Sequence, residues 1–289
     1  MTAKRKNRQL LTALAVLALS IGVAFLPITG REIPAEAAFQ PYEHLYTLPM
    51  KDFMADDIAD TGYLALINRQ HPISASPGEG LLVPAWPAVP VSVIQGMYLH
   101  PSALRAVAEM LSSAGEADIG TFFVSSGYRG YELQAQLYNG GENSAFALPP
   151  GHSEHHTGLA ADIMALGVSQ RTLGNSPQGR WLAENSYRYG LILRYPRGAE
   201  SVTGIEFEPW HFRYVGKVHA YFMKQNNLVL EEYIQLIRRM GSISFEKNNT
   251  KYLILFQEAE DGTIKLPYGM DFSVSSDNIS GFIITAWER

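Results

Sequence analysis

The alternation of apolar and polar positions along the chain predicts helices and strands in turn over most of its length. One helix is predicted to begin at Pro101 and another at Ser176-Pro177, because proline is favoured in the first helical turn. The other predicted helices cover residues 131–138, 218–225 and 228–240. Strands are predicted where β-branched and aromatic residues cluster, over residues 121–126, 159–164, 191–195 and, as a bent strand or strand pair, 205–214.

After Gly241 the pattern changes to short apolar runs separated by turn signals such as Asn248-Asn249 and Asp261-Gly262. This pattern predicts a small all-β appendage, close to the lower size limit for independent folding, so we expect it to pack on the preceding domain. The predicted fold class is α+β, with a small mixed sheet, flanking helices and this appendage.

The amino-terminal residues have the pattern of an export signal. A basic stretch containing Lys4 and Arg8 precedes the uncharged, mostly apolar residues 10–28, a length close to the roughly 20 residues that span a bilayer. An uncleaved anchor and a cleaved signal both fit, and either predicts that the rest of the chain lies outside the cytoplasmic membrane. We therefore expect an anchor or signal segment (1–30), a linker (31–60), a main domain (61–240) and a β-rich subdomain (241–289).

Composition narrows the chemistry. The 289 residues are 46% hydrophobic, which is enough for one sizeable core. The net charge of −5, without basic clusters in the body of the chain, argues against nucleic-acid binding. Because there is no cysteine, disulfides, thiolate zinc sites and a cysteine nucleophile are excluded, and any metal ion must be held by His, Asp or Glu.

Two separated clusters offer such ligands. Residues 150–162 contain three histidines and end at Asp162, and Glu208 and His211 lie three residues apart further on. His155, Asp162 and His211 would give a divalent ion two imidazoles and a carboxylate and leave a place for water. Beside the ion, Glu208 would accept the water's proton and Arg129 would steady an oxyanion, which together describe metal-assisted amide hydrolysis. Taken singly, each residue also has an ordinary structural reading, since most histidines only form hydrogen bonds or lie at the surface.

The order of these motifs resembles the zinc D-alanyl-D-alanine peptidases of the VanY type, a family that also contains VanX-type dipeptidases. Its wider fold group includes the Hedgehog signalling domain and lysostaphin-like endopeptidases. The resemblance extends from about Tyr63 through Glu232. It rests on the motifs Ser126-Gly127-Tyr128-Arg129, Ser153-x-His155-x-x-Gly158-x-Ala160-x-Asp162 and Glu208-x-x-His211.

The resemblance implies one Zn²⁺ per chain, bound by His155, Asp162 and His211, with Glu208 as general base and Arg129 as the transition-state cation. It also implies that Ser126, Gln134 and Ser153 line the substrate site. Of these, Gln134 and Ser153 would bind a terminal D-alanine carboxylate. Relatives often carry other residues at the positions of His152 and His156. Because the motif's spacing to Gly158 and Asp162 selects His155, we do not expect these two histidines to bind zinc.

The implied substrate is the D-Ala-D-Ala end of peptidoglycan precursors and stem peptides, which also lies outside the membrane. Removal of the last D-alanine would take away the target of vancomycin-type glycopeptides. Cleavage of the free dipeptide fits a cytoplasmic enzyme, and the amino-terminal segment argues against it. An L,D-carboxypeptidase, a wall endopeptidase and a non-catalytic, zinc-containing wall-binding module are the alternatives. The last of these would need neither Glu208 nor Arg129.

Overall fold

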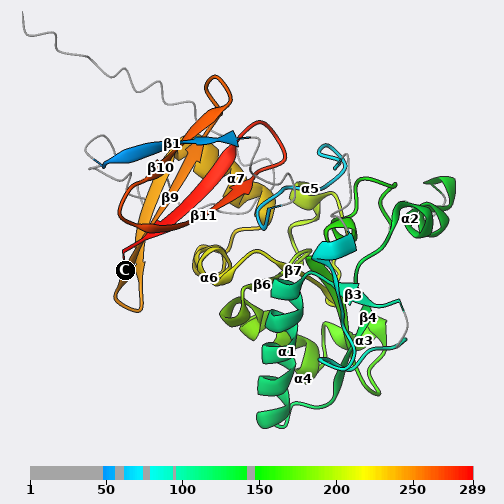
Figure 1. Cartoon of the computed structure of the whole chain (residues 1–289). Helices are drawn as coiled ribbons and strands as arrows, with labels where there is room; N and C mark the ends of the chain where they lie inside the picture. The colour runs from blue at the N-terminus through cyan, green and yellow to red at the C-terminus, as the bar shows by residue number, and fades with distance from the viewer. Residues whose placement is uncertain (1–47, 56–61, 74–78, 94–95, 142–146, 289) are drawn as a thin grey trace, which may run out of the picture.

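The computed structural model describes residues 48–55, 62–73, 79–93, 96–141 and 147–288 (Figure 1). The expected anchor or signal segment, residues 1–30, and most of the expected linker lie outside these ranges. Among the helices that the structure describes, none combines the length and apolar character needed to cross a bilayer.

A four-stranded sheet forms the centre of the main domain. Its order is β4-β5-β7-β6, and each neighbouring pair is antiparallel. The strands are β4 (Phe122–Ser126), β5 (Ala160–Ala165), β6 (Leu191–Leu193) and β7 (His211–Tyr214). An isolated parallel bridge joins Val91 to Val124. The predicted α+β class with a small sheet and flanking helices is confirmed.

The helices begin and end where local signals place them. His100 caps α1 by accepting a hydrogen bond from the Ser102 backbone at 3.1 Å, and Ser176 caps α4 by accepting one from Gly179 at 3.0 Å. Left-handed Asn139 ends α2. The helices are α1 (Pro101–Glu116), α2 (Tyr131–Tyr138), α3 (Gln170–Leu173), α4 (Pro177–Asn185), α5 (Glu200–Thr203), α6 (Lys217–Gln225) and α7 (Leu230–Met240).

Several short elements complete the main domain. They are the 3₁₀ turns η4 (Glu79–Leu81), η5 (Asn139–Gly141), η6 (Glu154–Thr157) and η7 (Ser186–Tyr189) and the strands β2 (Val83–Pro84) and β3 (Tyr98–Leu99). One expectation was wrong here. Only the end of residues 205–214 is a strand, which leaves Glu208 in the loop before β7.

Alternation along the strands directs different side chains to the two faces of the sheet. Phe212 of β7 joins a buried cluster with Val107 and Met110 of α1, so α1 covers one face. His211 and Arg213, its neighbours in the strand, point to the other face. Ile192 of β6 lies in the buried cluster that contains α6 and α7. His211 and Arg213 of β7 therefore lie on the side of the sheet that faces away from α1.

The carboxy-terminal residues form a β subdomain, drawn in orange and red in Figure 1. Its sheet has the order β11-β12-β9-β8, and β1 pairs with β10. The strands are β1 (Met50–Met54), β8 (Ser242–Lys247), β9 (Thr250–Gln257), β10 (Thr263–Pro267), β11 (Asp271–Ser276) and β12 (Phe282–Trp287). The linker expected over residues 31–60 is thus wrong for β1, because pairing across more than 200 residues leaves no local signal.

The β subdomain packs on the main domain, as its small size predicted. Ile243, Ile254 and Ile283 share one buried cluster with Tyr233 and Ile237 of α7. Helix α7 lies against the sheet of the β subdomain in Figure 1. The subdomain therefore shares its core with α7.

Candidate metal centre and active site

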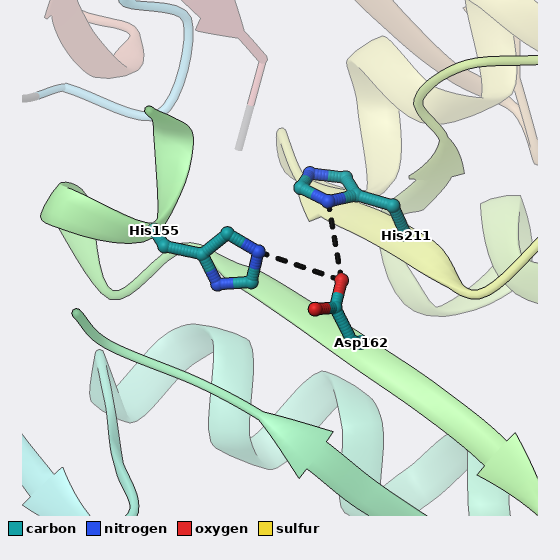
Figure 2. A group of neighbouring side chains, drawn as sticks. All are labelled: His155, Asp162 and His211. Atoms are coloured by element: carbon teal, nitrogen blue, oxygen red, sulfur yellow. Dashed lines mark ion pairs between the residues drawn. The ribbon is translucent and has the colours of Figure 1, made fainter. Parts of the chain in front are cut away.

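Two neighbouring strands and one turn bring the three expected ligands together (Figure 2). Asp162 of β5 lies directly opposite His211 of β7, and directly paired residues project to the same face of a sheet. His155 is supplied by η6, which ends at Gly158. Gly158 has φ +70°, and a Cβ there would lie 2.5 Å from the Leu82 side chain. Only glycine fits this turn without displacing its neighbours.

The three side chains converge on one point. Asp162 Oδ1 lies 3.4 Å from His155 Nε2 and 3.2 Å from His211 Nδ1. One ligand atom from each residue lies within 4.8 Å of the other two. His155 Nδ1 donates to the Gly127 carbonyl at 2.6 Å, which leaves Nε2 unprotonated and facing Asp162.

The residues present fit a divalent metal ion. His155 Nε2 and Asp162 Oδ1 are buried and have no hydrogen-bond partner, which is costly unless another group satisfies them. Two imidazoles and one carboxylate are a donor set that zinc accepts. The structure therefore supports a His/Asp/His metal site.

The neighbouring histidines are engaged elsewhere. His156 Nδ1 lies 2.7 Å from the Arg129 carbonyl, its Nε2 accepts from the Gly151 backbone at 3.0 Å, and its ring stacks on Tyr131. His152 Nδ1 lies 2.8 Å from the Asn68 carbonyl. Neither belongs to the ligand cluster among the described residues, in line with the expectation from the motif spacing.

Charge and burial set the ionisation of the ligands. Burial, followed by Arg129, lowers the pKa of His155 to about 4, so its ring is neutral at pH 7. Burial also lowers the pKa of His211, but the nearby carboxylates of Asp162 and Glu154 outweigh this and raise it to about 9. Burial alone would raise the pKa of Asp162, yet His155 and His211 hold it well below its usual range. A bound cation would compete with the proton of His211.

Glu208 lies beside the cluster, with Oε2 3.7 Å from His211 Nδ1. Burial raises the pKa of Glu208 to about 7; Asp162 adds to the rise, and His211 and Arg129 oppose it. A carboxyl group that titrates near neutral pH can both accept and return a proton. Its position and ionisation suit a general base.

His155, His211, Glu208 and Arg129 line a cavity together with two of the expected substrate-binding residues, Gln134 and Ser153. Its lining is Arg129, Gln134, Ala147, Leu148, Ser153, Glu154, His155, Tyr195, Ile205, Glu208 and His211. Arg129 Nε and Gln134 Oε1 are buried there without a hydrogen-bond partner. Ser126 does not line this cavity, although it pairs with Asp162 across the strands.

Gln134 is oriented for a different contact from the expected one. Its Nε2 donates to the Leu148 carbonyl at 2.6 Å, and its Oε1 has no partner. An amide oxygen accepts hydrogen bonds, so in this orientation it suits an N–H group of a peptide rather than a carboxylate.

Motif reasoning overlooked four residues around the ligands: Glu154, Arg194, Tyr195 and Arg213. Glu154 is fully buried next to His155, and its Oε1 lies 2.8 Å from Arg194 Nε. The Tyr195 ring lies 4.9 Å from that of His211. The signal available in the sequence was an arginine inside the apolar run 191–195, since a buried arginine needs a carboxylate.

Fold and site together define the class, a metallopeptidase-like α+β domain. A family model described as VanY, D-alanyl-D-alanine carboxypeptidase, matches residues 96–217. A D-alanyl-D-alanine carboxypeptidase of Enterococcus faecium is 37% identical over 66% of this chain and 62% of its own length. The bifunctional D-Ala-D-Ala dipeptidase and carboxypeptidase VanXYC of Enterococcus gallinarum is 34% identical over 59% of this chain and 92% of its own length.

Solved structures of peptidases resemble this fold. The vancomycin resistance D,D-dipeptidase VanXYg, in complex with a D-Ala-D-Ala phosphinate analog, gives a TM-score of 0.70 at 27% identity, covering 83% of this chain and 99% of that one. The LD-carboxypeptidase LdcB gives a TM-score of 0.56 at 32% identity, and the match covers 65% of this chain and 94% of that one. A D,D-pentapeptidase VanY mutant in complex with Zn(II) gives a TM-score of 0.50 at 35% identity, and the match covers 60% of this chain and 98% of that one.

The chain belongs to the VanY family of D-alanyl-D-alanine carboxypeptidases. It spans 62% of the length of the Enterococcus faecium relative.

Proposed function

We propose that this protein is a zinc-dependent D-alanyl-D-alanine carboxypeptidase that removes the last D-alanine from peptidoglycan stem pentapeptides and their precursors. The observation that carries the proposal is the convergence of His155, Asp162 and His211 beside a cavity, which Glu208 and Arg129 line together with the two histidines. Relatives described as carboxypeptidases support the reaction, and a relative in complex with Zn(II) supports the metal.

One zinc ion per chain would be held by His155, Asp162 and His211, where it would supply a polarised water at neutral pH. Glu208, whose pKa burial raises to about 7, would accept the proton of that water and return it to the leaving amine. Arg129 is half-buried at the cavity wall. Burial lowers its pKa, Asp162 and Glu208 oppose this, and an arginine side chain keeps its charge in proteins, so Arg129 would stabilise the negative charge that develops on the substrate carbonyl oxygen.

Substrate recognition falls to the remaining lining residues. The Ser153 hydroxyl is the donor proposed for the terminal carboxylate, and Gln134 Oε1 accepts from a backbone N–H of the peptide. Because buried polar groups discriminate strongly against ligands that leave them unpaired, these contacts select a free carboxyl terminus.

The specific likeness to LdcB supports a second candidate, an L,D-carboxypeptidase that acts on tetrapeptides. Purified protein should be incubated with UDP-muramyl-pentapeptide, the corresponding tetrapeptide and free D-Ala-D-Ala, and the products identified by mass. Release of D-alanine from the pentapeptide supports the proposal, and cleavage of only the tetrapeptide supports the second candidate. Turnover of only the dipeptide would make the protein a dipeptidase, and no turnover by the zinc-loaded protein would leave a non-catalytic wall-binding module.

We also propose that the protein acts outside the cytoplasmic membrane and is attached to it by residues 10–28, which are uncharged and mostly apolar. There, trimming of stem peptides would lower the number of vancomycin targets. Fractionation of expressing cells, with and without residues 1–30, tests the location. Recovery of the full chain in the cytoplasmic fraction would overturn it.

A further inference from the structure

A chain of charged side chains, buried except at the partly exposed Glu231, connects α7 to the metal centre. Glu231, in the first turn of α7, accepts two hydrogen bonds from the Arg194 guanidinium at 2.8 and 2.6 Å. The third nitrogen, Arg194 Nε, donates to Glu154 Oε1 at 2.8 Å. Glu154 Oε2 then lies 3.4 Å from His211 Nε2. Every donor nitrogen of Arg194 is thus directed at a carboxylate.

The group is balanced in charge, and three of its four members are closed to water. Arg213 NH1 lies 3.1 Å from Glu154 Oε1, so two guanidinium groups face two carboxylates. The side chains of Arg194, Arg213 and Glu154 have no exposed surface. Charges buried in this way are tolerated only when each is paired, which restricts Glu154 to one orientation.

Glu154 and His155 are neighbours in η6, yet their side chains contact different residues of the metal centre. His155 directs Nε2 toward Asp162, while Glu154 reaches the ring of His211. The contact from Glu154 occupies Nε2 of His211 and leaves Nδ1, 3.2 Å from Asp162, free to bind an ion. A single 3₁₀ turn therefore sets both imidazoles.

We propose that Glu154 is a positioning residue: held by Arg194 and Glu231, it fixes the ring orientation and tautomer of His211 so that Nδ1 binds the metal. This inference rests on the proposed function only in taking His155, Asp162 and His211 as the zinc site. It predicts that Glu154 sets metal affinity although it does not touch the metal.

Zinc affinity, measured by competition with a chromophoric chelator, tests the role directly. Glu154→Gln should weaken zinc binding by about 10- to 100-fold, the usual effect of losing a partner of a metal-bound histidine. The matched control is Asp277→Asn, which also removes a buried carboxylate from an arginine, Arg238, but in the β subdomain. The control should lower the melting temperature and leave zinc affinity unchanged. Equal loss in both variants, or wild-type affinity in Glu154→Gln, would overturn the proposal.

The zinc-loaded wild-type protein provides a second test that needs no variant to fold. With ¹⁵N-labelled histidine, NMR should show zinc on Nδ1 of His211 and a proton on Nε2 that exchanges slowly with water. Zinc on Nε2 of His211 would refute the proposal. Both measurements are independent of turnover, so a protein inactive on every peptide but bound to zinc as described would lose the proposed function and keep this inference.

Discussion

The imidazole rings of His155 and His211 stand almost perpendicular, at 88°, with their centroids 4.9 Å apart. They present different nitrogens, Nε2 and Nδ1, to the same oxygen of Asp162. The remaining nitrogens face the Gly127 carbonyl and the Glu154 carboxylate. Both rings are thus oriented before any ion binds, which reduces the ordering that binding requires.

Removal of one ring should abolish metal binding. His155→Ala is expected to retain almost no zinc after dialysis, because two ligands hold the ion far less well than three. His152→Ala is the matched control, since the ring of this neighbouring histidine lies 2.8 Å from the Asn68 carbonyl and is not part of the ligand cluster among the described residues. Metal content is measured by atomic absorption. Normal zinc in His155→Ala would refute the ligand assignment.

Loss of the proposed base should separate catalysis from metal binding. Glu208→Gln keeps the shape of the side chain but cannot accept a proton, so kcat should fall by about 10²- to 10⁴-fold while zinc content stays normal. Glu206→Gln, an exposed position in the same loop, should have wild-type kcat. D-alanine release from the pentapeptide gives the rates, and full activity in Glu208→Gln would disprove its role.

Two serines near the site should differ in their effect on substrate binding. Ser153 lines the cavity, whereas Ser126 does not, so Ser153→Ala should raise KM for the pentapeptide by about tenfold and Ser126→Ala by much less. Steady-state kinetics on the two variants make the comparison. A larger increase in KM for Ser126→Ala than for Ser153→Ala would show that the substrate binds beside Ser126 rather than in the cavity lined by Ser153.

The buried His219 should make the fold sensitive to acid. His219 Nδ1 lies 2.7 Å from the Tyr233 hydroxyl and Nε2 lies 3.0 Å from Thr285 Oγ1, and burial lowers the pKa of His219 to about 3. Between pH 6.5 and about 3 the unfolded chain binds a proton that the folded chain does not. As the pH falls through this range, His219 should therefore lower the free energy of unfolding by up to about 1.4 kcal/mol per pH unit.

His219→Gln is expected to flatten this dependence, because glutamine can bond to both hydroxyls without titrating. Urea denaturation of the wild-type and variant proteins between pH 4 and 7.5 gives the two slopes. Parallel slopes would show that His219 is charged in the folded state or does not govern acid stability.

The segment of residues 62–73 ties the β subdomain to the loop that carries the ligands. Asn278 Nδ2 donates to the carbonyls of Leu66 at 2.9 Å and Pro72 at 3.2 Å. At the other side, the Ile73 backbone donates to the Gly151 carbonyl at 2.8 Å. The β subdomain therefore contributes to the support of the active-site loop.

Asn278→Asp should destabilise the protein by about 1–3 kcal/mol, because the donor is lost and a carboxylate faces carbonyl oxygens. Asn249→Asp is the control, since Asn249 also has positive φ but is exposed in the β8–β9 turn. Chemical denaturation measures both free energies of unfolding. Equal stability of the two variants would argue against the supporting role.

Local sequence was sufficient for most elements and for the ligands. Helix α1 and strand β5 follow from short-range periodicity, and the spacing to Gly158 and Asp162 distinguished His155 from His152 and His156. Proline, glycine and capping residues act within a few residues of themselves, so their effect can be read along the chain.

Long-range pairing decided the rest. Strand β1 is a strand only because β10 lies beside it, and Glu208 is in a loop rather than a strand. The contact of Glu154 with Arg194 spans 40 residues, and that of Arg194 with Glu231 spans 37. The raised pKa of Glu208 likewise depends on burial and on charges brought from other elements. The sequence alone determined which residues form the candidate metal site. Only the folded chain determined how their orientations and charges are held, because burial and charge pairing arise between segments that are distant along the sequence.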